Sequence, residues 1–85
     1  MGLFDNRKKK SLLKKATNIM SQTKNLSKDN FEKGLELVNR ALELDPDDAL
    51  AWNLKGNAFI GMGKPEEGVK CLNKAIKLDP EFGLP

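Results

Sequence analysis

A segment that recurs 34 residues later is the feature that most limits what this 85-residue chain can fold into. Residues 31–46 read FEKGLELVNRALELDP, residues 65–80 read PEEGVKCLNKAIKLDP, and the two align without a gap. Seven of the sixteen aligned pairs are identical, including the closing Leu-Asp-Pro. A period of this length is typical of a repeated helical hairpin. We therefore expect an all-α chain of about four helices, built from antiparallel helix-turn-helix repeats.

Apolar residues recur at helical spacing between residues that end helices. Pro46 and Pro80 each disfavour helical geometry at the residue before them, and Gly61 or Gly63 can take a left-handed C-cap conformation. Gly34 lies inside a helical segment, where we expect a neighbouring helix to approach closely. The spacing predicts helices over 12–26, from Asp29 or Asn30 to Leu44, from an Asp47 or Asp48 cap to Phe59 or Ile60, and from Pro65 to just before Pro80.

The predicted apolar faces indicate how the helices pack. The face of the last helix consists of Val69, Leu72, Ala75 and Ile76. Each helical pair buries such a face only against a neighbour. Because the outer face of the last helix has no partner in this sequence, we expect a fragment of a longer array, self-association into a homo-oligomer, or marginal stability.

Charge divides the chain into two unequal parts. Residues 1–28 carry eight basic residues and one acid, a balance of +7, whereas residues 29–85 carry seven basic residues and eleven acids, a balance of −4. Lysines in a first turn oppose the helix dipole, so the basic start should fray. We expect a basic segment at 1–11, a repeat domain at 12–80 made of a degenerate unit 12–46 and a full unit 47–80, and a tail at 81–85.

Composition argues against several classes of protein. There is no histidine, which removes the commonest general base and the commonest metal ligand. The one cysteine, Cys71, cannot form an internal disulfide, and this fits the reducing cytoplasm. No apolar run approaches the ~20 residues that a membrane span needs, and the start lacks the apolar core of a signal peptide. We expect no enzyme, catalytic site, metal, cofactor or small-molecule substrate.

The segment 49–80 resembles the tetratricopeptide repeat family. The residues that carry this resemblance are Trp52, Gly56, Phe59, Gly68, Leu72, Ala75 and Pro80. The family's usual leucine before the first glycine is Lys55 here, and its usual alanine is Gly68. The preceding unit matches only in its second half, so its first helix is either a degenerate repeat helix or an unrelated capping helix. The resemblance implies an α-α superhelix.

The resemblance also implies a scaffold that binds a protein or peptide. In the family, the first helix of each pair lines the concave surface. By position, this surface would consist of Leu50, Asn53, Asn57 and Ile60 in the full unit, and of Ala16, Ile19, Thr23 and Leu26 in the other. Asn57 stands where some members hold a peptide's terminal carboxylate, but the basic residues that such a clamp also needs are missing at Leu50 and Asn53. Ordinary solvated positions are the other interpretation of both asparagines.

The basic cluster near the N-terminus supports an alternative function. Its members are Arg7, Lys8, Lys9, Lys10, Lys14 and Lys15. They are consistent with a solvated segment, with contact to an anionic membrane surface, or with weak, salt-dependent nucleic-acid binding.

Overall fold

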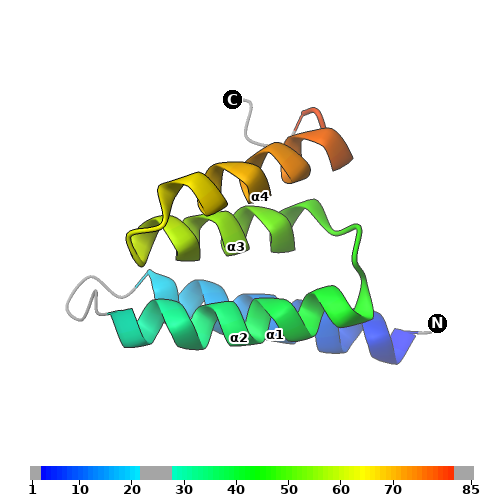
Figure 1. Cartoon of the computed structure of the whole chain (residues 1–85). Coiled ribbons are helices and arrows are strands. Elements are labelled where there is room, and N and C mark those ends of the chain that lie inside the picture. The colour runs from blue at the N-terminus through cyan, green and yellow to red at the C-terminus, as the bar shows by residue number, and fades with distance from the viewer. Residues whose placement is uncertain (1–2, 22–27, 82–85) are drawn as a thin grey trace.

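Four α-helices follow one another along the chain in a computed structural model that describes residues 3–21 and 28–81 (Figure 1). They are α1 (Leu3–Met20), α2 (Lys28–Leu44), α3 (Ala49–Gly61) and α4 (Pro65–Leu78). The helices α1 and α2 lie side by side, α3 packs across both, and α4 packs on α3 (Figure 1). The predicted all-α architecture of about four helices is therefore confirmed.

The second half of the fold has the caps that its sequence predicts. Asp48 precedes α3 with extended backbone, and its Oδ1 accepts a hydrogen bond of 3.1 Å from the amide of Ala51. Gly63 follows α3 with a φ of 80°, the left-handed geometry that ends many helices. Pro65 begins α4, where its missing amide hydrogen costs no helical hydrogen bond. The loop 62–64 therefore reverses the chain tightly and places α4 against α3.

The first helix differs from its prediction at both ends. It begins at Leu3 and so includes the basic residues that precede Ser11, and it ends at Met20 instead of residue 26. One reason for the early start is Lys9, whose side chain is fixed by two aspartates of the α2–α3 turn. Thr23 and Leu26 lie outside the described residues. The division of the chain into two units at residues 46 and 47 stays a prediction.

The main core lies where α1, α2 and α3 meet. It is made of small and aliphatic side chains with little or no exposure: Leu13, Ala16, Val38, Ala41, Ala51 and Leu54. Gly34 of α2 faces α1, because a Cβ there would lie 3.7 Å from the carbonyl oxygen of Ala16 and still closer to the side chain of Met20. The close approach predicted at Gly34 is thus present.

Small residues also bring α3 and α4 together. A Cβ on Gly56 would lie 2.8 Å from the carbonyl oxygen of Gly68, and a Cβ on Gly68 would lie 2.7 Å from that of Gly56. On α4 the buried stripe is Gly68, Cys71 and Ala75. The predicted apolar face of α4 is therefore wrong for Val69 and Ile76, which are exposed. The physical reason is that α4 contacts α3 through its smallest side chains, and this turns the larger ones outward.

Candidate functional site: a groove between the first helices of each pair

A groove of about 320 Å³ lies between α1 and α3, the first helices of the two pairs. Its lining combines basic, apolar and hydroxyl side chains: Lys9, Lys10, Leu13, Lys14, Thr17, Asp48 and Leu50. The α1 contribution to this lining repeats at intervals of three and four residues, so these side chains share one helix face. Leu50 and the N-cap of α3 supply the opposite wall.

The floor of the groove is fixed and its rim is exposed. Leu13 is buried in the core, and Thr17 donates a hydrogen bond of 2.8 Å to the carbonyl oxygen of Leu13. Leu50 keeps 42% of its surface exposed. Lys10 and Lys14 are exposed and make no ion pair with the described residues. The groove thus offers an apolar contact beside two positive charges.

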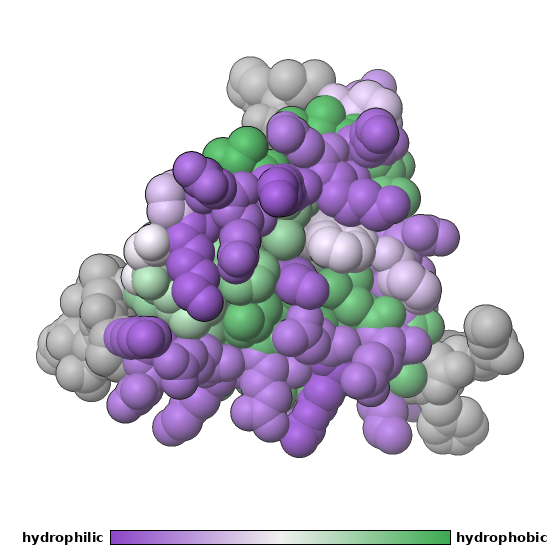
Figure 2. Space-filling model, in the orientation of Figure 1, coloured by the Kyte–Doolittle hydropathy of each residue, from purple (hydrophilic) through white to green (hydrophobic). Residues whose placement is uncertain are grey.

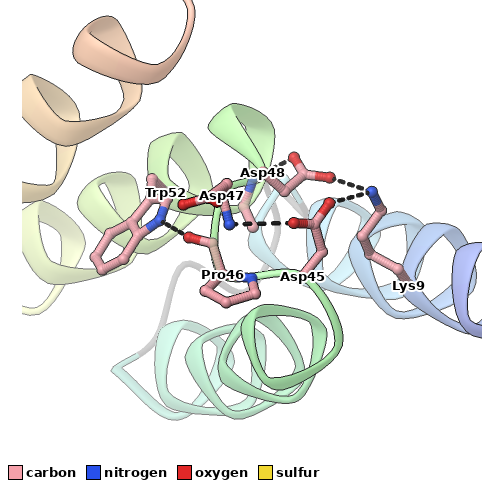
Figure 3. Close-up of polar contacts among 7 residues, drawn as sticks. Lys9, Asp45, Pro46, Asp47, Asp48 and Trp52 are labelled. Atoms are coloured by element: carbon pink, nitrogen blue, oxygen red, sulfur yellow. Dashed lines mark hydrogen bonds and ion pairs between the residues drawn. The ribbon is translucent and has the colours of Figure 1, made fainter. Parts of the chain in front are cut away.

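Lys9 connects the two walls of the groove. Its Nζ lies 2.9 Å from Oδ2 of Asp45 and 2.8 Å from Oδ2 of Asp48 (Figure 3). The hydrogen bonds to Asp48 and Asp45 hold the pKa of Lys9 above its usual value. The hydrogen bond from Lys9 likewise holds the pKa of Asp45 below the usual value for an aspartate. The side chain of Lys9 is only 16% exposed, so both pairs are partly shielded from water. Because Asp48 also caps α3, Lys9 fixes α1 to the start of α3.

The turn between α2 and α3 is stiffened by further hydrogen bonds. Oδ1 of Asp45 accepts from the amide of Asp47 at 3.1 Å, and Nε1 of Trp52 donates to the carbonyl oxygen of Pro46 at 2.7 Å (Figure 3). The ammonium of Lys55 lies 5.1 Å from the centre of the Trp52 ring, within the range of a cation–π interaction. The indole of Trp52 is therefore fixed to this turn, and the turn sets the angle between the helical pairs.

The residues predicted for a concave surface lie in several environments. Leu50 lines the groove. Asn57 and Ile60 are exposed elsewhere on α3, and Asn53 is half-buried. Ala16 is fully buried in the core and so cannot contact a ligand there, and Ile19 is half-buried outside the groove lining. Thr23 and Leu26 lie outside the described residues.

Two residues of the basic cluster, Lys10 and Lys14, line the groove. The sequence groups them with the other basic residues near the N-terminus, whereas in the structure they flank Leu13. The spacing of Lys10, Leu13, Lys14 and Thr17 is the signal that could have placed them. This spacing does not by itself identify the groove face of the helix, because the stripe that contains Ala16 and Ile19 is more apolar.

Other members of the basic cluster line a second cleft, between α1 and α2. This cleft of about 440 Å³ is lined by Lys8, Ser11, Leu12, Lys15, Arg40, Glu43 and Leu44. Arg7 is also exposed on α1. Of the six predicted basic residues, Lys9 is held in ion pairs, Lys10 and Lys14 border the groove, and Lys8 and Lys15 border the cleft.

The described residues contain no group of side chains that could hold a metal ion. Cys71 is a buried free thiol, and its burial raises its pKa, so the reactive thiolate is disfavoured. In the described parts of the chain, no helix is both long enough and apolar enough to cross a membrane.

Comparison with known protein families gives a match over the second helical pair. Residues 49–82 match the model named "Tetratricopeptide repeat". The match covers both α3 and α4 together with the loop between them. Comparisons with curated proteins and with solved structures found no match.

Proposed function

We propose that this tetratricopeptide repeat protein is an interaction module that holds a segment of a protein partner in the groove between α1 and α3. The observation that carries the proposal is that the first helices of both pairs line one groove, because the resemblance to the family implies that these helices carry the binding surface.

The lining supports a partner segment with an apolar side chain next to an acidic one. Leu50, which is exposed, provides the apolar contact, and burial of apolar surface contributes about 25 cal/mol per Å². Lys10 and Lys14 attract negative charge, since neither is neutralised by the described residues. Lys9 is not available for this purpose, because its ammonium is held by Asp45 and Asp48.

Selection of peptides from a random library against the full chain tests the proposal. Binding of the selected peptides is measured by fluorescence anisotropy with wild type and with Lys10→Glu, Lys14→Glu and Leu50→Asp. We expect each change to weaken binding about tenfold or more, which corresponds to about 1.4 kcal/mol. Lys33→Glu, an equal charge change on an exposed position of α2, is the matched control. Equal losses in the control and in the groove variants would contradict the proposal.

A second candidate function is binding of an anionic surface, and the α1–α2 cleft is the observation that favours it. Lys8, Lys15 and Arg40 line this cleft, together with Ser11 and a single acid, Glu43. Such contacts depend on salt, because the exposed charges release counterions when they bind.

Sedimentation with vesicles of neutral and of anionic lipid, and titration with a duplex oligonucleotide, test this second function. The Lys8→Glu/Lys15→Glu variant should lose binding, whereas Lys10→Glu/Lys14→Glu should keep more of it. Wild-type chain that binds neither probe at low salt would rule this function out. The two functions are separable, because the two lysine pairs line different hollows.

A further inference from the structure

The outer face of α4 presents large apolar side chains to solvent. Val69 is 49% exposed and Ile76 is 51% exposed, whereas Leu72 between them packs against Gly56 of α3. Val69 and Ile76 are seven residues apart, about two helical turns, so they lie along one stripe of the helix. Hydrophobic surface is visible among the polar side chains over α4 at the top of the molecule (Figure 2). Among the described helices, α4 packs against α3 alone, so no other helix covers this stripe.

Two opposite charges border the stripe at its two ends. Glu66 lies in the first turn of α4 and Lys77 in the last. They are eleven residues apart, about three helical turns, so both lie on the same side of the stripe. Both are exposed, and neither forms an ion pair with the described residues. The stripe therefore has a negative end and a positive end.

We infer that a second copy of this chain covers the outer face of α4, with the two α4 helices antiparallel about a two-fold axis. In this arrangement Val69 of one copy meets Ile76 of the other. Glu66 of each copy then lies beside Lys77 of the other. A two-fold interface contains every contact twice, so the dimer would have two Glu66–Lys77 pairs.

The other ways in which two copies could stack are less favourable electrostatically. A parallel pair of α4 helices would place the two copies of Glu66 on opposite sides of the interface, and likewise the two copies of Lys77, so neither charge would gain a partner of opposite sign. Head-to-tail stacking of α4 on α1 would bring Lys70 and Lys77 toward the exposed lysines of α1. Like charges in contact across an interface are destabilising and select against such pairings. In the antiparallel arrangement the apolar residues meet each other and, at the same time, the opposite charges meet each other.

Molar mass in solution, measured by light scattering and sedimentation equilibrium over a range of chain concentrations, tests the inference. We expect a dimer for wild type and a monomer for Ile76→Asp, with circular dichroism to check that the variant keeps its helices. The matched control is Leu50→Asp, the same kind of change at a similarly exposed position of α3, which should stay dimeric. A wild-type monomer at millimolar concentration, or a dimer that Ile76→Asp does not weaken, would overturn the inference.

Charge exchange tests the antiparallel geometry itself. We expect Glu66→Lys and Lys77→Glu each to weaken the dimer about tenfold, because each change places two like-charged contacts across the interface. The double variant Glu66→Lys/Lys77→Glu restores both pairs with their signs exchanged, so its dissociation constant should return close to that of wild type. A double variant that dimerises no better than either single variant would refute the antiparallel pairing. A further helix of a partner protein on the same stripe would give a wild-type monomer and so that same negative result.

Discussion

Replacement of Lys9 by methionine should destabilise the fold far more than replacement of its exposed neighbours. The change removes the ammonium and keeps an unbranched apolar stem of similar length. The lost contacts are 2.9 Å to Asp45 and 2.8 Å to Asp48. Asp45 and Asp48 then remain close together without a shared counter-charge, and Asp48 is the side chain that caps α3.

The size of the effect follows from the burial of each partner. Hydrogen bonds to charged groups contribute about 1.5–3 kcal/mol when they are shielded from water. The Asp48 side chain is only 15% exposed, so the full value applies to it, whereas the more exposed Asp45 adds little. We expect a loss of about 2–3 kcal/mol in the free energy of unfolding, which lowers the melting temperature of a domain this small by roughly 10–20 °C.

Urea unfolding followed by circular dichroism and by Trp52 fluorescence provides the assay. Trp52 is a suitable probe because its indole bonds to Pro46 inside the same turn. The control is Lys8→Met, which removes an exposed charge from the same helix and should change stability by less than about 0.5 kcal/mol. In an Asp48→Asn background, which keeps a capping side chain at this position, the cost of Lys9→Met should shrink. The reasoning would be refuted if Lys9→Met cost no more than Lys8→Met.

Three further outcomes are expected. Gly56→Ala should cost about 1–3 kcal/mol in urea unfolding because its Cβ would press on the backbone of α4, whereas Gly34→Ala meets chiefly a flexible methionine side chain and should be close to neutral; equal losses would contradict this. The folded-state pKa of Asp45 is lowered, so its stabilisation is fully present above the ordinary aspartate pKa of about 3.9 and is lost as pH falls from there through the lower folded-state pKa. The urea midpoint should therefore drop less with acid in Lys9→Met than in wild type. The Cys71 thiol should react slowly with a chromogenic disulfide at neutral pH and rapidly in denaturant, since its pKa is raised by burial in the fold; fast reaction of the native chain would show that α4 is detached.

Local signals were sufficient wherever one residue determines a helix end. Asp48, Pro65 and Gly63 act through their own backbone or the nearest turn, so their roles were predictable from the sequence.

The start of α1 and the outer face of α4 could not be predicted in the same way. The helix at residues 3–11 depends on contacts between Lys9 and residues that are far away in the sequence. For α4, hydrophobicity favoured Val69 and Ile76 for the core, whereas close helix packing selected Gly68 and Ala75. The candidate groove was only partly predicted, because Leu50 was assigned to it and Lys10 was not.

The order of helix contacts in Figure 1 also bears on how fast the chain folds. Most contacts join helices that are adjacent in the sequence, namely α1 with α2, α2 with α3, and α3 with α4. Such local topology favours rapid folding, and either hairpin can form first. The bond from Lys9 to Asp45 spans 36 residues, so it should form late, after both hairpins have met. Loss of this bond should then accelerate unfolding and leave the folding rate almost unchanged.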